Sequence, residues 1–337
     1  MRKLIAVALT LVLLLLCSCT NTGTTPQPTT PTEPETAGYM IIEEIDHCVV
    51  EPDDELHMSE EDKAHYKMLM EGMLNRESKI NLSDSKEQNE YYLDLLKQSP
   101  YFFFIDDYNL SDNSVDFTYA YSEEQQNKML SFIDDKFLKI VNSNASENDN
   151  TLDKILNVYA AVAREMTYDH SRTKDMELES PLFQYPDDEI YLALKKSSSV
   201  CYGFAYTLRF ALLQLDIDCF CVYGPCRDQG EAHMWNIFKY NDKFYTCDVA
   251  WDRSEEDYAQ LNHFGKTTKE REVDSLKIKD YSSTFFDEYG EIECTDETFK
   301  IFRSIDRYSI VSTHTYFLSD FQGNEYIFDT ETLEMKK

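Results

Sequence analysis

Three residues of this sequence have the types that nucleophilic catalysis needs: Cys201, His233 and Asp248. A thiol attacks a carbonyl carbon when a nearby base takes up its proton and a third group orients that base. The three residues are far apart along the chain, so only the fold can bring their side chains together. If it does, the sequence holds the parts of a cysteine-dependent acyl-transfer site.

The residues around Cys201 predict that it lies in the first turn of a helix. Ser197 to Ser199 are good N-cap residues. Unpaired backbone N–H groups and the positive end of the helix dipole favour a thiolate at such a position. Gly203 in a first turn indicates that something approaches the backbone closely. Taken alone, a buried structural cysteine is the alternative. The apolar residues that repeat at helical spacing are Phe204, Leu208, Ala211, Leu212 and Leu215.

Two expected strands, residues 232–240 and 244–250, carry the histidine and the aspartate. If Asn241-Asp242 forms a two-residue hairpin loop, His233 and Asp248 become diagonal neighbours on one face, roughly 7 Å apart at the backbone. The carboxylate can then hold one imidazole nitrogen and leave the other for the thiol. A structural ion pair is the alternative for two arbitrary residues, but three suitable groups converging from three segments favour catalysis.

Apolar periodicity and turn residues predict further elements along the chain. Thr151 is expected to cap a helix, and residues 171–188, which are polar and contain prolines, to form a loop that can cover a cleft. Helices are expected at 59–75, 125–141 and 151–166. Further strands are expected at 101–105, 115–121, 316–318 and 325–328.

Three blocks of the sequence together resemble the transglutaminase-like superfamily, over about residues 152–252. The resemblance implies an α+β fold of the papain-like type, in which a helix bearing the cysteine packs on an antiparallel sheet bearing the histidine and the aspartate. It implies that Cys201 is the nucleophile, His233 the general base and acid, and Asp248 the orienting carboxylate. The blocks are Val200-Cys201-Tyr202-Gly203-Phe204-Ala205, His233-Met234-Trp235-Asn236 and Phe244-Tyr245-Thr246-Cys247-Asp248-Val249-Ala250-Trp251-Asp252.

Three positions depart from the family pattern without removing a catalytic atom. Ser199 stands at a position usually held by a smaller residue, Phe244 replaces a common Trp, and Ala250 replaces a common Ser or Thr. Tyr202 and Trp235 are candidates for lining a substrate groove, and a core aromatic is the alternative for Trp235.

The resemblance implies acyl transfer on a protein or peptide amide, without cofactor or metal. Hydrolysis, as by a protease or amidase, is favoured over cross-linking by a transglutaminase, because water is always present and no amine site is visible in the sequence. Cell-wall peptides are one substrate class for an exported protein. A binding module that keeps the fold without turnover is the alternative.

The start of the chain has the pattern of an export signal. A short basic start precedes an almost wholly apolar run, Leu4 to Leu16, which is too short to span a membrane comfortably. Leu16-Cys17-Ser18-Cys19 resembles the end of a bacterial lipoprotein signal. The resemblance implies that Cys19 carries lipid and anchors the exported chain to the outer face of the cell membrane. A plain secreted protein is the alternative.

Composition and resemblance together divide the chain into five expected parts. They are a signal peptide at 1–18, a Thr/Pro-rich tether at 19–38, an N-terminal α+β region at 39–145, the transglutaminase-like core at 150–280 and a C-terminal segment with a hairpin at 281–337.

The charge and the cysteines narrow the possible partners. The formal net charge is −31, from 63 acidic and 32 basic residues. Such a surface repels phosphate backbones, so nucleic acid is a poor partner. Cys219, Cys221 and Cys226 lack the spacing of a known zinc site. Cys48 and Cys294 are the residues left over that could bridge the N-terminal region to the C-terminal segment.

Overall fold

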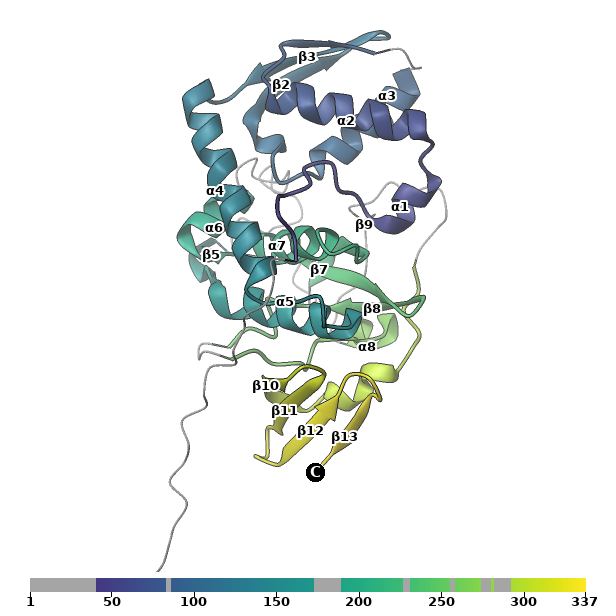
Figure 1. Cartoon of the computed structure of the whole chain (residues 1–337), viewed down its shortest axis with the longest axis vertical. Coiled ribbons are helices and arrows are strands. Elements are labelled where there is room, and N and C mark those ends of the chain that lie inside the picture. Colours follow the sequence, from purple (N-terminus) through teal and green to yellow (C-terminus); the bar gives the residue numbers. More distant parts are fainter. Residues whose placement is uncertain are drawn as a thin grey trace, which may run out of the picture. The chain divides into compact units, whose positions relative to one another are not determined.

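The computed structural model describes residues 41–82, 86–172, 189–226, 231–254, 258–273, 280–281 and 292–337 (Figure 1). The expected signal peptide, Cys19 and the tether lie outside these residues, as does nearly all of the expected loop at 171–188.

The described part of the chain has an α+β fold of helices and antiparallel sheets, as the sequence predicted. The helices are α1 (Pro52–His57), α2 (Glu60–Leu74), α3 (Lys86–Lys97), α4 (Glu123–Asn142), α5 (Thr151–Glu165), α6 (Glu189–Lys196), α7 (Cys201–Leu213) and α8 (Thr268–Val273). The strands are β1 (Lys79–Asn81), β2 (Ile105–Leu110), β3 (Ser114–Tyr119), β4 (Thr167–Tyr168), β5 (Ser198–Ser199), β6 (Cys219–Cys226), β7 (Glu231–Tyr240), β8 (Lys243–Cys247), β9 (Asp280–Tyr281), β10 (Ile305–Ser312), β11 (Thr315–Asp320), β12 (Glu325–Asp329) and β13 (Glu334–Lys336).

Helix α7 packs on an antiparallel sheet whose strand order is β8-β7-β6-β9 (Figure 1). Buried residues occupy both faces of this sheet. The α7 face belongs to the main core, which includes Met234, Phe238 and Tyr245. A second, smaller cluster contains Trp235 and Phe220. Because both faces are buried, the strands hold their register firmly and can fix a site at their ends.

The hairpin between β7 and β8 has the predicted register. Asn241 and Asp242 form the turn with φ of 50° and 56°, and Tyr240 pairs with Lys243. Two residues with positive φ fit the type of turn that matches the strand twist. The sequence suggested that the second strand runs to Ala250, but β8 ends at Cys247. The strand stops there because the chain turns back, and the N–H of Asp252 donates to the carbonyl of Asp248.

Three of the predicted helices are confirmed as α2, α4 and α5, but the cap of α5 is Asn150 and not Thr151. The Asn150 side chain accepts the N–H of Asp153, and the Asp153 carboxylate accepts the N–H of Asn150. This reciprocal pair satisfies two backbone donors, which a Thr one residue later does not do.

The expected strand at 101–105 is wrong. Residues Phe102–Phe104 form a 3₁₀ turn, and the strand begins only at Ile105. Phe103 and Phe104 are both buried and their rings lie 4.4 Å apart. A strand would send these consecutive side chains to opposite faces, so the turn is what lets both enter one core.

The outer sheets hold the other predicted strands. Strands β1, β3 and β2 form one sheet and include the predicted strand at 115–121. The predicted terminal hairpin is β11 and β12, which lie inside a four-stranded sheet of order β10-β11-β12-β13. The flanking strands β10 and β13 were not predicted. The boundaries proposed for the five parts of the chain stay predictions.

Among the described residues, Cys48, Cys201, Cys219, Cys221, Cys247 and Cys294 are free thiols, so the bridge suggested between Cys48 and Cys294 is wrong. In the same part of the chain no group of three or more His, Cys, Asp or Glu is placed to hold a metal ion.

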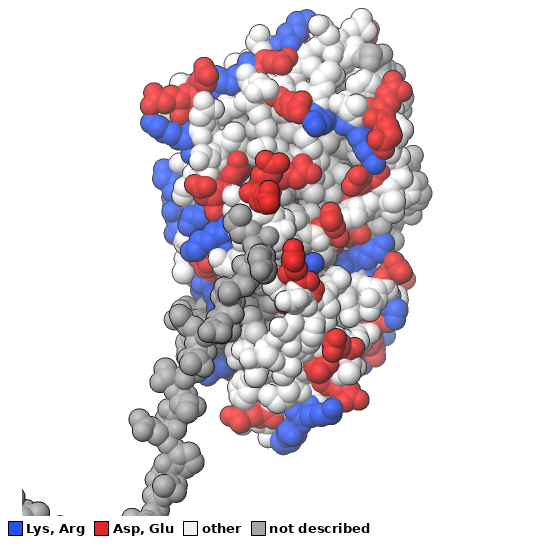
Figure 2. All heavy atoms as spheres, viewed as in Figure 1, with Lys and Arg blue, Asp and Glu red and all other residues white. Residues whose placement is uncertain are grey.

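No described helix is both long and apolar enough to cross a membrane. Figure 2 shows one face of the molecule, on which groups of acidic side chains alternate with Lys and Arg.

A buried ion pair connects α7 to the segment before α1. Arg209 donates from Nε and Nη2 to the two carboxylate oxygens of Glu51, at 2.6 and 2.8 Å. Both side chains are buried, and Arg209 also bonds the carbonyl of Gln98 at 3.2 Å. The helix that begins at Cys201 is therefore held in place by a residue 158 positions before Arg209.

We expect Glu51→Gln to lower the free energy of unfolding by about 3–5 kcal/mol, because it leaves the buried guanidinium without a counter-ion. Denaturant unfolding measures the change. The matched control is Glu124→Gln, which breaks an exposed pair with Lys128 and costs about 1 kcal/mol or less. Adding Arg209→Met to Glu51→Gln should restore much of the loss. A loss below about 1 kcal/mol in Glu51→Gln would contradict this account.

Candidate active site

Cys201 is the first residue of α7, and its side chain is fully buried. The N-cap is Val200, whose side chain makes no capping bond, so the predicted capping by Ser197 to Ser199 is wrong. Two of these serines instead form β5, which pairs in parallel with β4. A valine side chain cannot accept from the first N–H groups of the helix, so no N-cap side chain takes up these donors.

Gly203 allows the segment before Cys201 to pack closely against the first turn of α7. A Cβ at this position would lie 2.3 Å from Ser199 Oγ and 2.8 Å from Ala193 Cβ. The close approach that the sequence indicated is thus made by the chain itself, where α6 and β5 pack against the first turn of α7. A side chain here would displace the residues directly before the thiol.

The imidazole of His233 lies between Asp248 and Cys201. Its Nε2 is 2.7 Å from Asp248 Oδ2, which leaves Nδ1 as the ring nitrogen free to serve the Cys201 sulfur, and the charge of Cys201 acts on the imidazole. The backbone N–H of Met234 points at the same sulfur, at 3.4 Å. The structure therefore brings the three predicted side chains together from α7, β7 and the end of β8.

Burial by itself would lower the pKa of His233. The negative charges of Asp248 and Cys201 outweigh it and raise that pKa from 6.5 to about 10. Burial would likewise raise the pKa of Asp248, but the charges of His233 and Arg271 outweigh it and hold that pKa well below its usual range. The imidazole is therefore held beside an ionised carboxylate that can only accept hydrogen bonds.

Residues 139–249 match the family model of the transglutaminase-like superfamily, and this range contains all three side chains. The chain carries a transglutaminase-like domain. The packing of α7 on the antiparallel sheet β8-β7-β6-β9 is the α+β arrangement that the sequence blocks implied.

Two solved structures are similar to parts of the chain. One is a TGase, with 16% identity over 53% of this chain and 52% of that one, at a TM-score of 0.30. The other is a putative cysteine protease from Cytophaga hutchinsonii, with 13% identity over 41% and 51% and a TM-score of 0.28. The chain spans about half the length of each. No curated protein sequence matches it.

Asp248 of the transglutaminase-like domain has two further partners that the sequence did not reveal. Arg271 Nη2 donates to Oδ2 at 2.6 Å, and the N–H of Trp251 donates to Oδ1 at 3.1 Å. Arg271 lies on α8, beyond the matched range, and is buried. No spacing rule connects a six-residue helix to a carboxylate 23 positions earlier, so the sequence carried no signal for this contact.

A second buried carboxylate, Asp252, holds the turn after β8. It accepts the Tyr159 hydroxyl at 2.7 Å and the N–H of His263 at 2.8 Å. Burial raises the pKa of Asp252 to about 7, although these donors act in the opposite direction. Asn236 of the predicted block is also buried, and its Nδ2 donates to the carbonyl of Ala205. This bond fastens β7 to α7, one turn after the thiol.

The two groove candidates are both buried, with Tyr202 at 3% and Trp235 at 1% of full exposure. The Trp235 ring lies 6.1 Å from the His233 ring, and the Trp251 ring lies 4.9 Å from it. Both indole rings are stacked with the imidazole, at interplanar angles of 17° and 28°. A role of Tyr202 and Trp235 in binding substrate stays a prediction.

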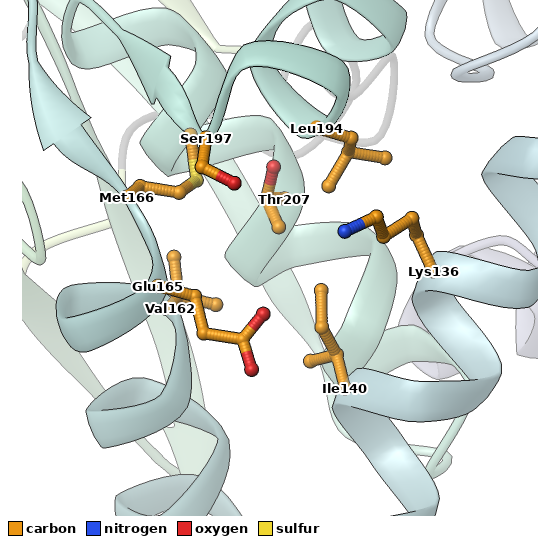
Figure 3. Close-up of a pocket in the computed structure, with 8 residues that line it drawn as sticks. All are labelled: Lys136, Ile140, Val162, Glu165, Met166, Leu194, Ser197 and Thr207. Atoms are coloured by element: carbon orange, nitrogen blue, oxygen red, sulfur yellow. The ribbon is translucent and has the colours of Figure 1, made fainter.

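A small pocket lies among α4, α5, α6 and α7 and contains none of the candidate catalytic residues (Figure 3). Lys136 and Glu165 stand at its sides, and the buried hydroxyl of Thr207 lies inside it. The other residues that line it are Ile140, Val162, Met166, Leu194 and Ser197. It is separate from the site of the thiol.

Proposed function

We propose that this protein is a cysteine-dependent acyl-transfer enzyme that acts on peptide amides. Cys201 attacks the amide carbonyl, and the proton it releases goes to His233. His233 then protonates the departing amine as the C–N bond breaks, which leaves a thioester on Cys201. The observation that carries the proposal is the buried arrangement of the three side chains: Asp248 lies on Nε2 of the imidazole, and the sulfur lies against the N–H of Met234, the residue after His233.

The oxyanion of the tetrahedral intermediate needs hydrogen-bond donors. Two backbone donors lie beside the sulfur: the N–H of Cys201, at the uncapped start of α7, and the N–H of Met234. Met234 N–H already points at Sγ and can turn to the oxyanion when the acyl group is bound. These donors support the same step without any cofactor.

For the second half of the reaction we favour water as the acceptor, which makes the protein a protease or amidase. An amine acceptor would give a cross-linking transglutaminase by the same steps. The apolar start of the chain and Cys19 support a location on the outer face of the bacterial membrane, held by lipid. Peptides at the cell surface, including cell-wall peptides, are then the substrates within reach.

One observation favours the alternative, a binding module that retains the fold. Cys201 is 0% and His233 only 4% exposed, so the thiol is closed to solvent in this structure. Turnover requires that the covering side chains move when substrate arrives. A protein that only binds a partner has no such requirement.

Iodoacetamide labelling separates the two functions. At pH 6 we expect Cys201 to react faster than Cys219 and Cys247, because burial raises the pKa of those two thiols well above its usual value and keeps them protonated. Peptide mass spectrometry reads the rate at each cysteine. His233→Gln is the matched control and should bring labelling of Cys201 down to that of the others. Equal, slow labelling of all three thiols in the parent chain would favour the binding module.

Trapping of the intermediate tests the reaction itself. The processed protein is incubated with a cell-surface peptide extract, quenched in acid and analysed for a mass increase on the peptide that contains Cys201. An acyl adduct on that residue, absent from Cys201→Ala, supports acyl transfer. An adduct that persists in Cys201→Ala refutes the assignment of the nucleophile.

A further inference from the structure

Arg271 contacts the same carboxylate oxygen of Asp248 that His233 does. Its Nη2 donates to Asp248 Oδ2 at 2.6 Å, and His233 Nε2 is 2.7 Å from the same oxygen. Its guanidinium also lies over two indole rings, 5.5 Å from the centre of Trp235 and 5.1 Å from that of Trp251. The side chain is 1% exposed. A planar cation held between rings and a carboxylate cannot reorient easily.

The hydrogen bonds of Arg271 determine where its neighbours carry protons. A guanidinium only donates, so His263 Nδ1, which lies 3.2 Å from Nη1, must accept and carry no proton. Asp248 accepts from Arg271, from His233 and from the N–H of Trp251, and therefore stays an ionised acceptor. Facing such an acceptor, His233 keeps a proton on Nε2, and its Nδ1 is the nitrogen that exchanges a proton with the thiol.

The charges of this buried group cancel only because Arg271 is present. Asp248 carries one negative charge and Arg271 one positive charge. Cys201 and His233 add no net charge, either as thiol and imidazole or as thiolate and imidazolium. Without Arg271, His233 would be the only counter-ion of a buried carboxylate and would hold its proton more tightly.

We propose that Arg271 is a positioning residue for the acyl transfer proposed above: it neutralises and orients Asp248, so that His233 can both take a proton from Cys201 and release it to the leaving amine. The proposal rests on the proposed function. It goes beyond the resemblance, because Arg271 lies on α8, outside the three sequence blocks and outside residues 139–249. Other ionisable groups that act on Asp248 or Arg271 are Asp252, His263, Cys247 and Tyr159.

The first test measures the proton affinity of His233 without turnover. In a Cys201→Ala background, which removes the thiolate, ¹⁵N NMR follows the titration of the imidazole. We expect Arg271→Gln, which keeps a donor for Asp248 but removes the charge, to raise the titration midpoint by at least about one pH unit, since a nearby positive charge is lost. Arg271→Lys keeps the charge and should leave the midpoint near that of the background.

The matched control is Arg303→Met. Arg303 follows the 3₁₀ helix Thr298–Phe302 and pairs with Glu270 of α8 at 2.8 Å, and its other hydrogen bonds go to the carbonyls of Phe264, Gly265 and Phe299. This variant therefore breaks an arginine ion pair on the same helix without removing a contact of Asp248 or His233, and it should leave the midpoint unchanged. A midpoint in folded Arg271→Gln equal to that of the background would overturn the proposal.

The second test uses iodoacetamide labelling of Cys201 in the chain that retains the thiol. Arg271→Gln should move the pH of half-maximal labelling upward. The lysine of Arg271→Lys makes fewer hydrogen bonds than the guanidinium that it replaces. In this variant the rate of Cys201 labelling should fall by about 10-fold or more, with little change in the pH of half-maximal labelling. If Arg271→Gln does not fold, the Lys variant decides: labelling at the parent rate overturns the proposal. Failure of the proposed function gives a different result from failure of this proposal: Cys201 of the parent chain would then label no faster than Cys219.

Discussion

Replacing Cys201 by Ala should abolish acyl transfer, with kcat/KM falling by on the order of 10⁴–10⁶-fold. Removal of a catalytic nucleophile has effects of this size, because the remaining groups can only bind substrate and stabilise its oxyanion. The variant should fold, since the change removes one sulfur and one weak bond from the Met234 N–H. Peptide hydrolysis measured against the parent chain, together with circular dichroism, checks both expectations.

The control for this variant is Cys219→Ala. Cys219 is as buried as Cys201, but it lies on β6 and burial keeps its thiol protonated. Its loss creates a small cavity, which lowers stability without touching the site. We expect its kcat/KM to stay within a few-fold of the parent value. Cys201→Ser completes the series, because a hydroxyl keeps the shape but ionises far less readily than a thiol. Residual activity of Cys201→Ala above about 1% of the parent rate would show that another group is the nucleophile.

The three candidate residues were accessible from sequence because each depends on local rules. Helical periodicity places Cys201 at the start of a helix, while its candidate role rests on the resemblance of the three blocks. The pairing of His233 with Asp248 follows from the two-residue turn Asn241-Asp242, which sets the register of β7 and β8. Once the register is known, the side-chain alternation of strands decides which residues share a face.

The contacts that complete the site were not accessible, because each joins segments with no rule between them. Arg271 lies on a helix too short to show periodicity, and its partner is fixed only by the packing of the whole domain. The strand predicted for the aromatic run at 101–105 was wrong for a related reason. The composition of this run suits a strand, but both Phe103 and Phe104 have to enter the same core. Tertiary packing overrides local propensity at such places.

Asp248→Asn should lower kcat/KM by on the order of 10³–10⁴-fold, while also destabilising the fold. Three donors face the two side-chain oxygens of Asp248, namely Arg271 Nη2, His233 Nε2 and the N–H of Trp251. An amide offers only one oxygen, and its NH₂ group must then face a donor. The imidazole relieves this clash by moving its proton to Nδ1, the nitrogen that should receive the proton of the thiol. Catalysis is lost in this way when a triad carboxylate becomes an amide.

The same change leaves Arg271 buried with no counter-ion, which should cost about 3–5 kcal/mol of unfolding free energy. Adding Arg271→Gln to Asp248→Asn separates the two effects. The double variant no longer buries an uncompensated charge, so its stability should recover by a large part of that loss, as denaturant unfolding would measure. Its activity should not recover, because nothing then keeps the proton on Nε2 of His233. If activity returned with stability, Asp248 would serve the fold and not the reaction; if neither returned, the charge of Arg271 would not be balanced by Asp248.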